Sequence, residues 1–326
     1  MEYARLGHSG LKVSRLGLGA MGFGSKAWRP WVLDEAATLP IVSRAIEHGI
    51  NFFDTCDFYS AGESERILAA TLVRRHSRDS FVLATKAGNP MAAHPNGRGY
   101  SRKHLLRAID DSLTRLGTDH VDLFQTHIWD PKADLDELVS TMGDIVRSGK
   151  ALYVGVTTMP AWTLAICRAK AAQGAGAAFL SMQCEYNPAH RECERELVPL
   201  CLSEGVGLIP FSPMARGFLS ADRRDPANDT ARTRNDDYTT KYYYRSSDHA
   251  VQEAVTRVAE RHGKSPSQVS LAWTLSRPGV TAPIFGATSV DQVDAAVKAL
   301  SLVLEDADVA SIDAAYAPRP LWASGH

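Results

Sequence analysis

The chain alternates between short apolar segments and segments with helical periodicity, and this alternation restricts its possible folds more than any other feature. Strands that alternate with helices form a parallel sheet, because each parallel pair needs a crossover connection. Eight such units predict a single closed (β/α)8 barrel, the TIM barrel, within the α/β class. The eight segments typical of buried strands are Leu16–Met21, Asn51–Thr55, Phe81–Lys86, Val121–His127, Ala151–Thr157, Leu180–Glu185, Gly207–Pro213 and Ala282–Ala287.

Three of the intervening segments combine helical periodicity with a glycine stop. Apolar residues recur every three or four positions through residues 105–116, 135–146 and 251–258. Gly117, Gly149 and Gly263 follow them, and glycine is favoured there because it enters the left-handed region at little cost. Before the first barrel strand, a His-Ser-Gly turn between two short strands predicts an N-terminal β-hairpin over residues 3–14.

The main alternative fold is an open doubly wound sheet, which would carry a glycine-rich turn between its first strand and first helix. Residues 17–22 match the pattern GxGxxG, but Trp28-Arg-Pro-Trp31 separates this match from the next helix. No repeat or linker divides the chain, so residues 1–326 are predicted to form one domain. Met214–Ser247 is polar and rich in Arg, Asp and Tyr, which predicts a long loop after strand 7, either functional or disordered.

Composition argues against several classes of function. The 326 residues carry a formal net charge of −1 at pH 7, which gives no bulk attraction to nucleic acid or to an anionic membrane. The sequence shows no signal-peptide core and no apolar run long enough to span a bilayer. The five cysteines form no CxxC pair, and their odd number fits a reducing compartment. We therefore expect a cytoplasmic protein, and the spacing of His and Cys predicts no metal site.

Polar side chains stand at the carboxyl ends of three consecutive predicted strands. Asp54, Lys86 and His127 occupy these ends, and Tyr59 follows Asp54 by five residues. Taken singly, each has a simpler structural explanation, such as capping a turn, reaching solvent or packing in the core. In a parallel barrel, however, all strands open on the same face at their carboxyl ends. The shared position of the four residues therefore favours a catalytic site.

The residues and their order resemble the aldo-keto reductase family. Asn51–Glu65 is similar to that family's Asn-Phe-Phe-Asp-Thr-Ala-x-x-Tyr-Gly signature, with Cys56 and Ser60 as substitutions. The resemblance covers nearly the whole chain and is strongest to the branch that contains aryl-alcohol dehydrogenase-like and versiconal hemiacetal acetate reductase-like proteins. Further matches follow in register at Leu83–Lys86, Gln125–Asp130, Val154–Met159, Ser181–Asn187, Ile209–Gly217 and Pro283–Thr288.

This resemblance implies NAD(P)(H)-dependent, reversible reduction of an aldehyde or ketone, with Tyr59 as general acid and Asp54, Lys86 and His127 as its supports. The residue types suit that chemistry, because a phenol with an ordinary pKa near ~10 needs a nearby cation to release its proton. Lys86 can supply the cation, and His127 can orient the carbonyl oxygen. The implied partner is a small-molecule carbonyl compound. Its identity, the physiological direction and the oligomeric state stay open.

The resemblance also implies which residues contact the cofactor and the substrate. Phe211 is expected to stack on the nicotinamide, and Thr157-Thr158 stands where the family usually has Ser-Asn. NADP(H) is the predicted cofactor, with NAD(H) as the alternative, because residues 286–292 contain no Lys or Arg for a 2′-phosphate. Trp28, Trp31 and Trp129 are expected to line the substrate site. The expected cofactor contacts are Met21, Gly22, Thr157, Thr158, Gln183, Phe211, Ser212, Met214, Arg216, Gly217, Gly286, Ala287, Thr288, Ser289 and Gln292.

Two other functions are compatible with a barrel of this kind. One is a regulatory or scaffold protein that keeps the barrel and a bound nucleotide, similar to the potassium-channel β-subunits. The complete set Asp54, Tyr59, Lys86 and His127 favours the enzyme over this alternative. The other is a barrel hydrolase that uses Asp54 and His127, but the sequence offers it no evident nucleophile or metal set.

Overall fold

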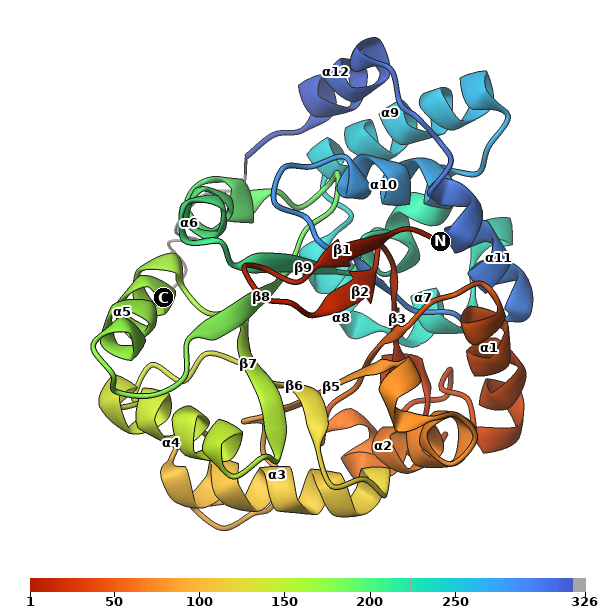
Figure 1. Cartoon of the computed structure of the whole chain (residues 1–326). Helices are drawn as coiled ribbons and strands as arrows, with labels where there is room; N and C mark the ends of the chain where they lie inside the picture. The colour runs from red at the N-terminus through yellow and green to blue at the C-terminus, as the bar shows by residue number, and fades with distance from the viewer. Residues whose placement is uncertain (223, 319–326) are drawn as a thin grey trace.

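The computed structural model, which describes residues 1–222 and 224–318, contains eight parallel strands closed into a barrel (Figure 1). Neighbours around the barrel run in the order β10-β3-β4-β5-β6-β7-β8-β9. Closure confirms the predicted TIM barrel and excludes the open sheet. The barrel strands are β3 Gly17–Gly19, β4 Phe52–Asp54, β5 Val82–Ala87, β6 Val121–Thr126, β7 Ala151–Thr157, β8 Phe179–Glu185, β9 Gly207–Phe211 and β10 Ile284–Phe285.

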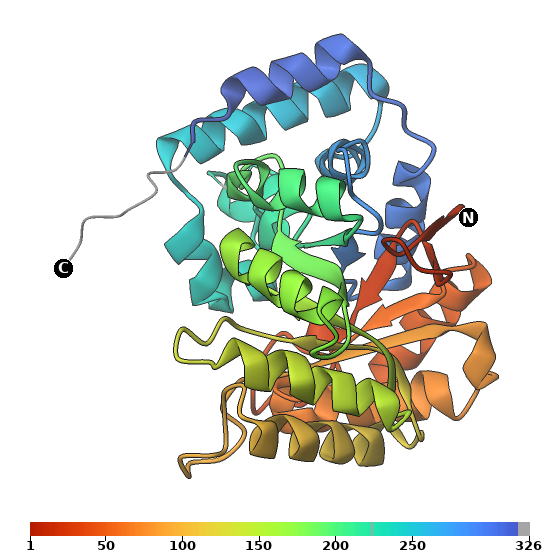
Figure 2. The same cartoon turned by 60° about the vertical axis from the view of Figure 1, so that its left-hand side comes forward.

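Helices surround the barrel (Figures 1 and 2). Gly117, Gly149 and Gly263 all have positive φ at the predicted helix ends. No helix in the described part of the chain is long and apolar enough to cross a membrane. The α-helices are α1 Glu35–Glu47, α2 Glu63–Leu68, α3 Arg102–Leu116, α4 Leu135–Arg147, α5 Ala161–Ala172, α6 Leu197–Glu204, α7 Ala231–Asn235, α8 Asp237–Tyr242, α9 Ser246–His262, α10 Pro266–Leu275, α11 Val290–Ala299 and α12 Asp306–Ala315. The shorter helical turns are η1 Ala20–Gly22, η2 Tyr59–Gly62, η3 Ala69–Val73, η4 Arg78–Ser80, η5 Glu192–Glu194, η6 Ala215–Ser220 and η7 Pro226–Asn228.

Two of the three glycines in the GxGxxG match serve packing inside the barrel. Gly17 and Gly19 lie in β3, beside β10. A Cβ atom built on Gly17 would lie 2.4 Å from Cδ1 of Ile284, and one on Gly19 would lie 2.7 Å from Cγ2 of the same residue. Any larger side chain would therefore clash with Ile284, which explains both glycines without a phosphate-binding role.

The predicted N-terminal hairpin, β1 Tyr3–Arg5 and β2 Lys12–Ser14, lies across one end of the barrel (Figure 1). Leu6 and Val13 from this hairpin are fully buried in an apolar cluster with barrel residues such as Phe52. This burial removes apolar surface from water and plugs the barrel at the amino ends of its strands. The predicted catalytic residues lie at the opposite end, where the strands finish.

Two features of the sequence prediction need correction. The segment Met214–Ser247 is more ordered than the predicted long loop, because it contains η6, η7, α7 and α8. Several barrel strands are shorter than predicted: the first ends at Gly19 and continues as the short helix η1, β9 ends at Phe211, and β10 comprises only Ile284–Phe285. Arg223 within the long segment, and residues 319–326 of the predicted single domain, lie outside the described residues.

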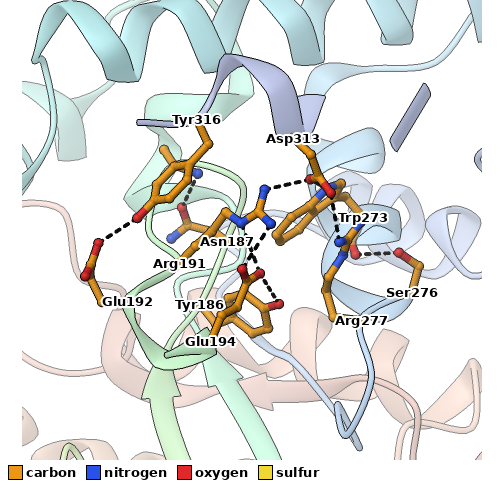
Figure 3. Close-up of polar contacts among 11 residues, drawn as sticks. Tyr186, Asn187, Arg191, Glu192, Glu194, Trp273, Ser276, Arg277, Asp313 and Tyr316 are labelled. Carbon is orange, nitrogen blue, oxygen red and sulfur yellow. Dashed lines mark hydrogen bonds and ion pairs between the residues drawn. The ribbon is translucent and has the colours of Figure 1, made fainter. Parts of the chain in front are cut away.

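The C-terminal helix α12 lies along α9 and joins the barrel through a buried polar cluster (Figures 2 and 3). Asp313 accepts hydrogen bonds from Nη1 of Arg191 at 2.7 Å, from Nη1 of Arg277 at 3.1 Å and from Nε1 of Trp273 at 2.9 Å. The Arg191 guanidinium also lies 5.1 Å from the ring centroids of Trp273 and Tyr316. One carboxylate thus holds two arginines between α12, α10 and the segment after β8.

We predict that Asp313→Ala lowers the free energy of unfolding by roughly 1–3 kcal/mol, because it removes the carboxylate that pairs with Arg277 and one of the two that pair with Arg191, which keeps Glu194. The loss should stay below that of a fully buried pair, since 29% of the Asp313 side chain is exposed. Urea denaturation measures the change. Asp306→Ala, at the exposed start of the same helix, is the control, and an equal loss in both variants would contradict this role for the cluster.

Candidate active site

The four predicted catalytic residues meet at the carboxyl end of the barrel. Asp54 ends β4, Lys86 lies near the end of β5, His127 directly follows β6, and Tyr59 begins η2. The rings of Tyr59 and His127 meet edge to face with centroids 5.6 Å apart, and Nζ of Lys86 lies 5.3 Å from the Tyr59 ring centroid. The structure therefore gathers all four around the Tyr59 ring.

A buried ion pair lies at the base of this group. Nζ of Lys86 donates to Oδ2 of Asp54 at 2.6 Å and to the carbonyl oxygen of Thr55 at 2.8 Å. The second Asp54 oxygen accepts from Nε2 of Gln183 at 3.0 Å and from Nε2 of Gln125 at 3.3 Å. The exposed fractions of the Lys86 and Asp54 side chains are 0% and 4%. Because an unpaired charge is costly to bury, Asp54 stabilises the cationic form of Lys86.

The surroundings of Tyr59 and His127 fix their protonation states near neutral pH. Burial, and then the neighbouring Cys56 and Asp54, raise the pKa of the Tyr59 phenol well above its usual value. Burial, and then the charge of Lys86, hold the pKa of His127 well below its usual value. The phenol is therefore protonated and the imidazole neutral, as a proton donor and a neutral hydrogen-bond donor require.

Asn89 sets the tautomer of His127. Its side-chain nitrogen Nδ2 lies 2.7 Å from Nδ1 of His127. An amide NH2 group only donates, so Nδ1 accepts and the single proton of the neutral ring resides on Nε2. Sequence analysis did not identify Asn89, although its signal is simple: it is a polar residue three positions after Lys86, just past the end of β5.

Strained backbone concentrates around this end of the barrel. Left-handed φ values at non-glycine residues cost about 1–3 kcal/mol each and cluster at ligand sites. In such turns, successive backbone N–H groups can form a concave anion site. Within the described residues such values follow β4, β7 and β9, at Ser60 (51°), Ala61 (53°), Thr158 (54°), Ser212 (54°), Ala215 (48°) and Arg216 (57°), and one more occurs at Tyr244 (76°), between α8 and α9.

The residues predicted to hold the cofactor lie in the turns after the barrel strands. Two of them make contacts that the sequence did not predict: Gln183 donates its amide to Asp54, and the Thr158 hydroxyl donates to the carbonyl oxygen of His127 at 3.2 Å. Met21 and Gly22 lie in η1, Thr157 ends β7, Phe211 ends β9, Ser212, Met214, Arg216 and Gly217 follow β9, and Gly286, Ala287, Thr288, Ser289 and Gln292 follow β10.

Three arginines share one buried carboxylate beside these turns. Oδ2 of Asp236 accepts from Nη2 of Arg216 at 2.7 Å and from Nε of Arg232 at 3.3 Å. Nη1 of Arg29 lies 3.9 Å from Oδ1 of Asp236. Burial, and then Arg216, lower the pKa of Arg232 to about 10. Arg232 therefore stays cationic near neutral pH, but one carboxylate does not balance the positive charge of the three arginines. The arrangement favours an added anion.

Arg232 brings a cation to the turn after β10, where the sequence contains none. A Cβ atom built on Gly286 would lie 4.0 Å from Nη1 of Arg232. Ser289 in that turn caps α11, since its hydroxyl oxygen accepts from the backbone N–H of Gln292 at 3.4 Å. Sequence analysis counted Arg232 only as one of several basic residues in the long segment, because no local pattern links it to a turn 54 positions away.

The three predicted substrate-lining tryptophans take different positions. The Trp28 ring lies 6.3 Å from that of Tyr59, next to the catalytic group. Trp31 is only 5% exposed, and Arg232 lies over its ring at 4.7 Å, so Trp31 packs against the arginines. Trp129 packs against Trp162, with centroids 6.1 Å apart. Of the three, Trp28 is the one whose ring the structure places against Tyr59.

A second buried acid stands beside the catalytic group. Asp57 is 1% exposed, and neither of its side-chain oxygens has a hydrogen-bond partner among the described residues. Burial, and then the nearby carboxylate of Glu65, raise the pKa of Asp57 to about 8. Sequence analysis did not identify Asp57, although its signal is simple: it is a second acid, three positions after Asp54.

We predict that Asp57→Asn stabilises the fold increasingly as pH rises. The pKa of Asp57 moves from 3.8 to about 8 on folding, so the folded state binds the extra proton and wild-type stability falls as pH rises through that window. The amide of the variant has no proton to lose. Urea denaturation at about pH 5 and about pH 8 tests the difference. Asp79→Asn, on the surface, is the control, and a gap that does not change with pH would contradict the assignment.

A family model described as the aldo/keto reductase family matches residues 15–317. The chain belongs to the aldo/keto reductase family. Aldo/keto reductases are oxidoreductases that generally use NAD(P)H, so the protein is an oxidoreductase of the carbonyl-reducing kind.

Similar aldo/keto reductases come from fungi. Versiconal hemiacetal acetate reductase of Aspergillus parasiticus is 38% identical over 343 residues, which cover 98% of each chain. A putative aryl-alcohol dehydrogenase of Schizosaccharomyces pombe is 35% identical over 98% of this chain and 97% of the relative. An aldo-keto reductase of Fusarium vanettenii is 34% identical over 100% and 93%. These similarities confirm the branch that the motifs predicted.

Proposed function

We propose that this aldo/keto reductase reduces an aldehyde or ketone to an alcohol with NADPH as the preferred donor and Tyr59 as the general acid. The observation that carries the proposal is the buried Lys86–Asp54 pair, at 2.6 Å, with Nζ of Lys86 5.3 Å from the ring centroid of Tyr59. A phenol in that position can deliver a proton, and the neighbouring cation stabilises the phenolate that remains.

In the proposed reaction the side chains stabilise and then protonate the negative charge that develops on the carbonyl oxygen. A bound reduced nicotinamide supplies the hydride for the carbonyl carbon. Tyr59 donates its phenolic proton to the oxygen, and Lys86 stabilises the resulting phenolate. His127 donates from Nε2 to the same oxygen and so orients the substrate, while Asn89 keeps the ring in the required tautomer. Trp28 offers an apolar wall beside Tyr59 for the substrate body.

The residues at the barrel end fit a dinucleotide. The left-handed turn at Ser212, Ala215 and Arg216 presents backbone N–H groups of the kind that bind phosphates. Arg216 and Arg232, with Arg29 nearby, add cations that one carboxylate balances only in part. Phe211, at the end of β9, is partly exposed, which suits an aromatic that stacks on the nicotinamide. We therefore assign the pyrophosphate to the turn after β9.

Arg232 supports the choice of NADPH over NADH. The 2′-phosphate of NADPH needs a cation near the turn after β10, and residues 286–292 contain none. The position of Arg232 next to Gly286 supplies that cation from the segment after β9. A charged phosphate would also offset the shortage of negative charge around Arg232.

The first test of the proposal is Tyr59→Phe, which keeps the ring and removes the acidic proton. Loss of a general acid should lower kcat by about 100-fold or more, with little change in the Kd for NADPH. NADPH oxidation with a panel of aldehydes and ketones measures the rate. Wild-type turnover in the variant would remove Tyr59 from the mechanism. NADPH binding without turnover of any compound by the wild-type protein would favour the regulatory alternative.

The second test concerns cofactor choice. Arg232→Ala should lower kcat/KM for NADPH by roughly 10- to 100-fold, the value of one charge-assisted hydrogen bond, and leave kcat/KM for NADH nearly unchanged. Arg234→Ala, which removes an exposed arginine from the same helix, is the matched control. Ser289→Arg should raise the NADPH/NADH ratio by placing a second cation in the turn. Equal losses for both cofactors in Arg232→Ala would mean that the residue does not bind the 2′-phosphate.

A further inference from the structure

Three side chains with metal-binding donor atoms lie together beside Tyr59. Cys56 and Asp57 follow β4, and His127 follows β6, which lies on the other side of β5. Their sulfur, carboxylate oxygen and ring nitrogen all lie within 4.8 Å of one another. Sequence analysis predicted no metal site because it considered only His and Cys residues close together in the sequence. His127 lies 70 positions after Asp57.

The state of Asp57 points independently to a missing partner. Burying a carboxylate is costly unless a cation or a hydrogen-bond donor compensates it, and both Asp57 oxygens lack a partner among the described residues. The nearby buried acid Glu65 has its own partners, since Nε of Arg115 lies 2.5 Å from Oε2 and the Thr85 hydroxyl donates to Oε1 at 2.6 Å. Asp57 is thus a buried acceptor with no assigned role, a kind of group that calls for an unseen ligand.

We propose that Cys56, Asp57 and His127 form a binding site for one Zn²⁺ ion, and that zinc at this site blocks catalysis. Sulfur, nitrogen and carboxylate oxygen together are the donor set that zinc accepts in proteins, whereas Mg²⁺ and Ca²⁺ prefer oxygen alone. Zinc displaces the protons of the Cys56 thiol and the Asp57 carboxyl group, and the resulting thiolate and carboxylate supply two negative charges, which match the charge of the ion. The neighbouring Lys86 pairs with Asp54 at 2.6 Å, which offsets part of its repulsion of the ion.

The geometry requires only a small closure of the three donors. Tetrahedral zinc, with bonds of about 2.0–2.3 Å, places its donor atoms roughly 3.3–3.7 Å apart, against the limit of 4.8 Å in the metal-free arrangement. Nδ1 of His127 is occupied by Asn89, so Nε2 is the nitrogen that binds the metal. Rotation of the Asn89 amide would then present its oxygen to the Nδ1 proton, as a histidine bound to zinc requires. His127 is partly exposed, which gives the ion a path from the open end of the barrel.

Zinc at this position would inhibit the enzyme because it takes His127 away from the carbonyl oxygen. Inhibition should therefore be competitive with the carbonyl substrate and reversible by a chelator. This part of the inference rests on the proposed function, since it requires His127 to orient the substrate. Binding of the metal does not rest on it, so binding and turnover are measured separately.

The binding experiment uses the chelator-treated full-length protein and Co²⁺ as a spectroscopic substitute for Zn²⁺. The wild type should show a thiolate-to-cobalt charge-transfer band that saturates at one ion per chain, and Zn²⁺ should displace it. Cys56→Ala should abolish the band. Asp57→Asn should weaken Zn²⁺ binding by more than about 100-fold, because loss of even an outer-shell partner of a metal ligand costs 10- to 100-fold. Cys167→Ala, which removes another buried cysteine, should leave the band unchanged, and circular dichroism confirms that each variant is folded.

The inhibition experiment follows NADPH oxidation with an aryl aldehyde at increasing Zn²⁺. Wild type and Cys167→Ala should lose activity and recover it with EDTA, whereas Cys56→Ala should resist the same zinc concentrations by at least about 10-fold. A wild type without a charge-transfer band, or a band that persists in Cys56→Ala, would overturn the site. Zinc bound through Cys56 without inhibition would overturn its link to His127. If no carbonyl compound is turned over, the cobalt spectra still decide the metal site and the failure belongs to the proposed reaction.

Discussion

The ion pair between Lys86 and Asp54 is the interaction on which the candidate active site depends. Both side chains are buried, and the pair links β4 and β5, while Gln125 and Gln183 extend the network to β6 and β8. Removing one partner of such a pair costs about 3–5 kcal/mol, because the other charge stays in a poorly solvating interior. The ion pair therefore fixes the positions of Lys86 and Asp54 near Tyr59, because any arrangement that separates the two charges costs this free energy.

The barrel separates stability from chemistry along its axis. At the amino ends of the strands, the hairpin inserts Leu6 and Val13 into an apolar cluster, and close packing against Ile284 requires glycine at position 17, where β3 begins. At the carboxyl ends, left-handed turns and buried charges collect after β4, β7 and β9. Strained backbone conformations of this kind persist only where the packing of the surrounding residues holds them in place. Packing at the plugged end and closure of the strands supply that support.

The segment after β9 holds the charged side chains of the proposed cofactor site in fixed positions. Asp236 holds Arg216 and Arg232 in defined positions, which reduces the side-chain entropy that an anion would otherwise have to remove. One buried carboxylate does not neutralise its arginine neighbours, so the group retains attraction for phosphate. The cluster around Asp313 is balanced in charge, because Arg191 and Arg277 face two carboxylates, Asp313 and Glu194, and it ties α12 to the barrel (Figure 3).

The sequence by itself determined the eight-strand barrel, the glycine stops, and the placement of Asp54, Tyr59, Lys86 and His127 at one end of it, because these follow from periodicity and from motifs a few residues long. Only the tertiary structure decided which residues complete the site. Asn89 meets His127, Arg232 reaches Gly286, and Cys56 and Asp57 stand next to His127 through contacts between strands or segments far apart in the chain. A local pattern fixes the face on which a side chain lies. Closure of the barrel decides which distant side chain it meets there, because that depends on strand order and on the path of the long segment after β9.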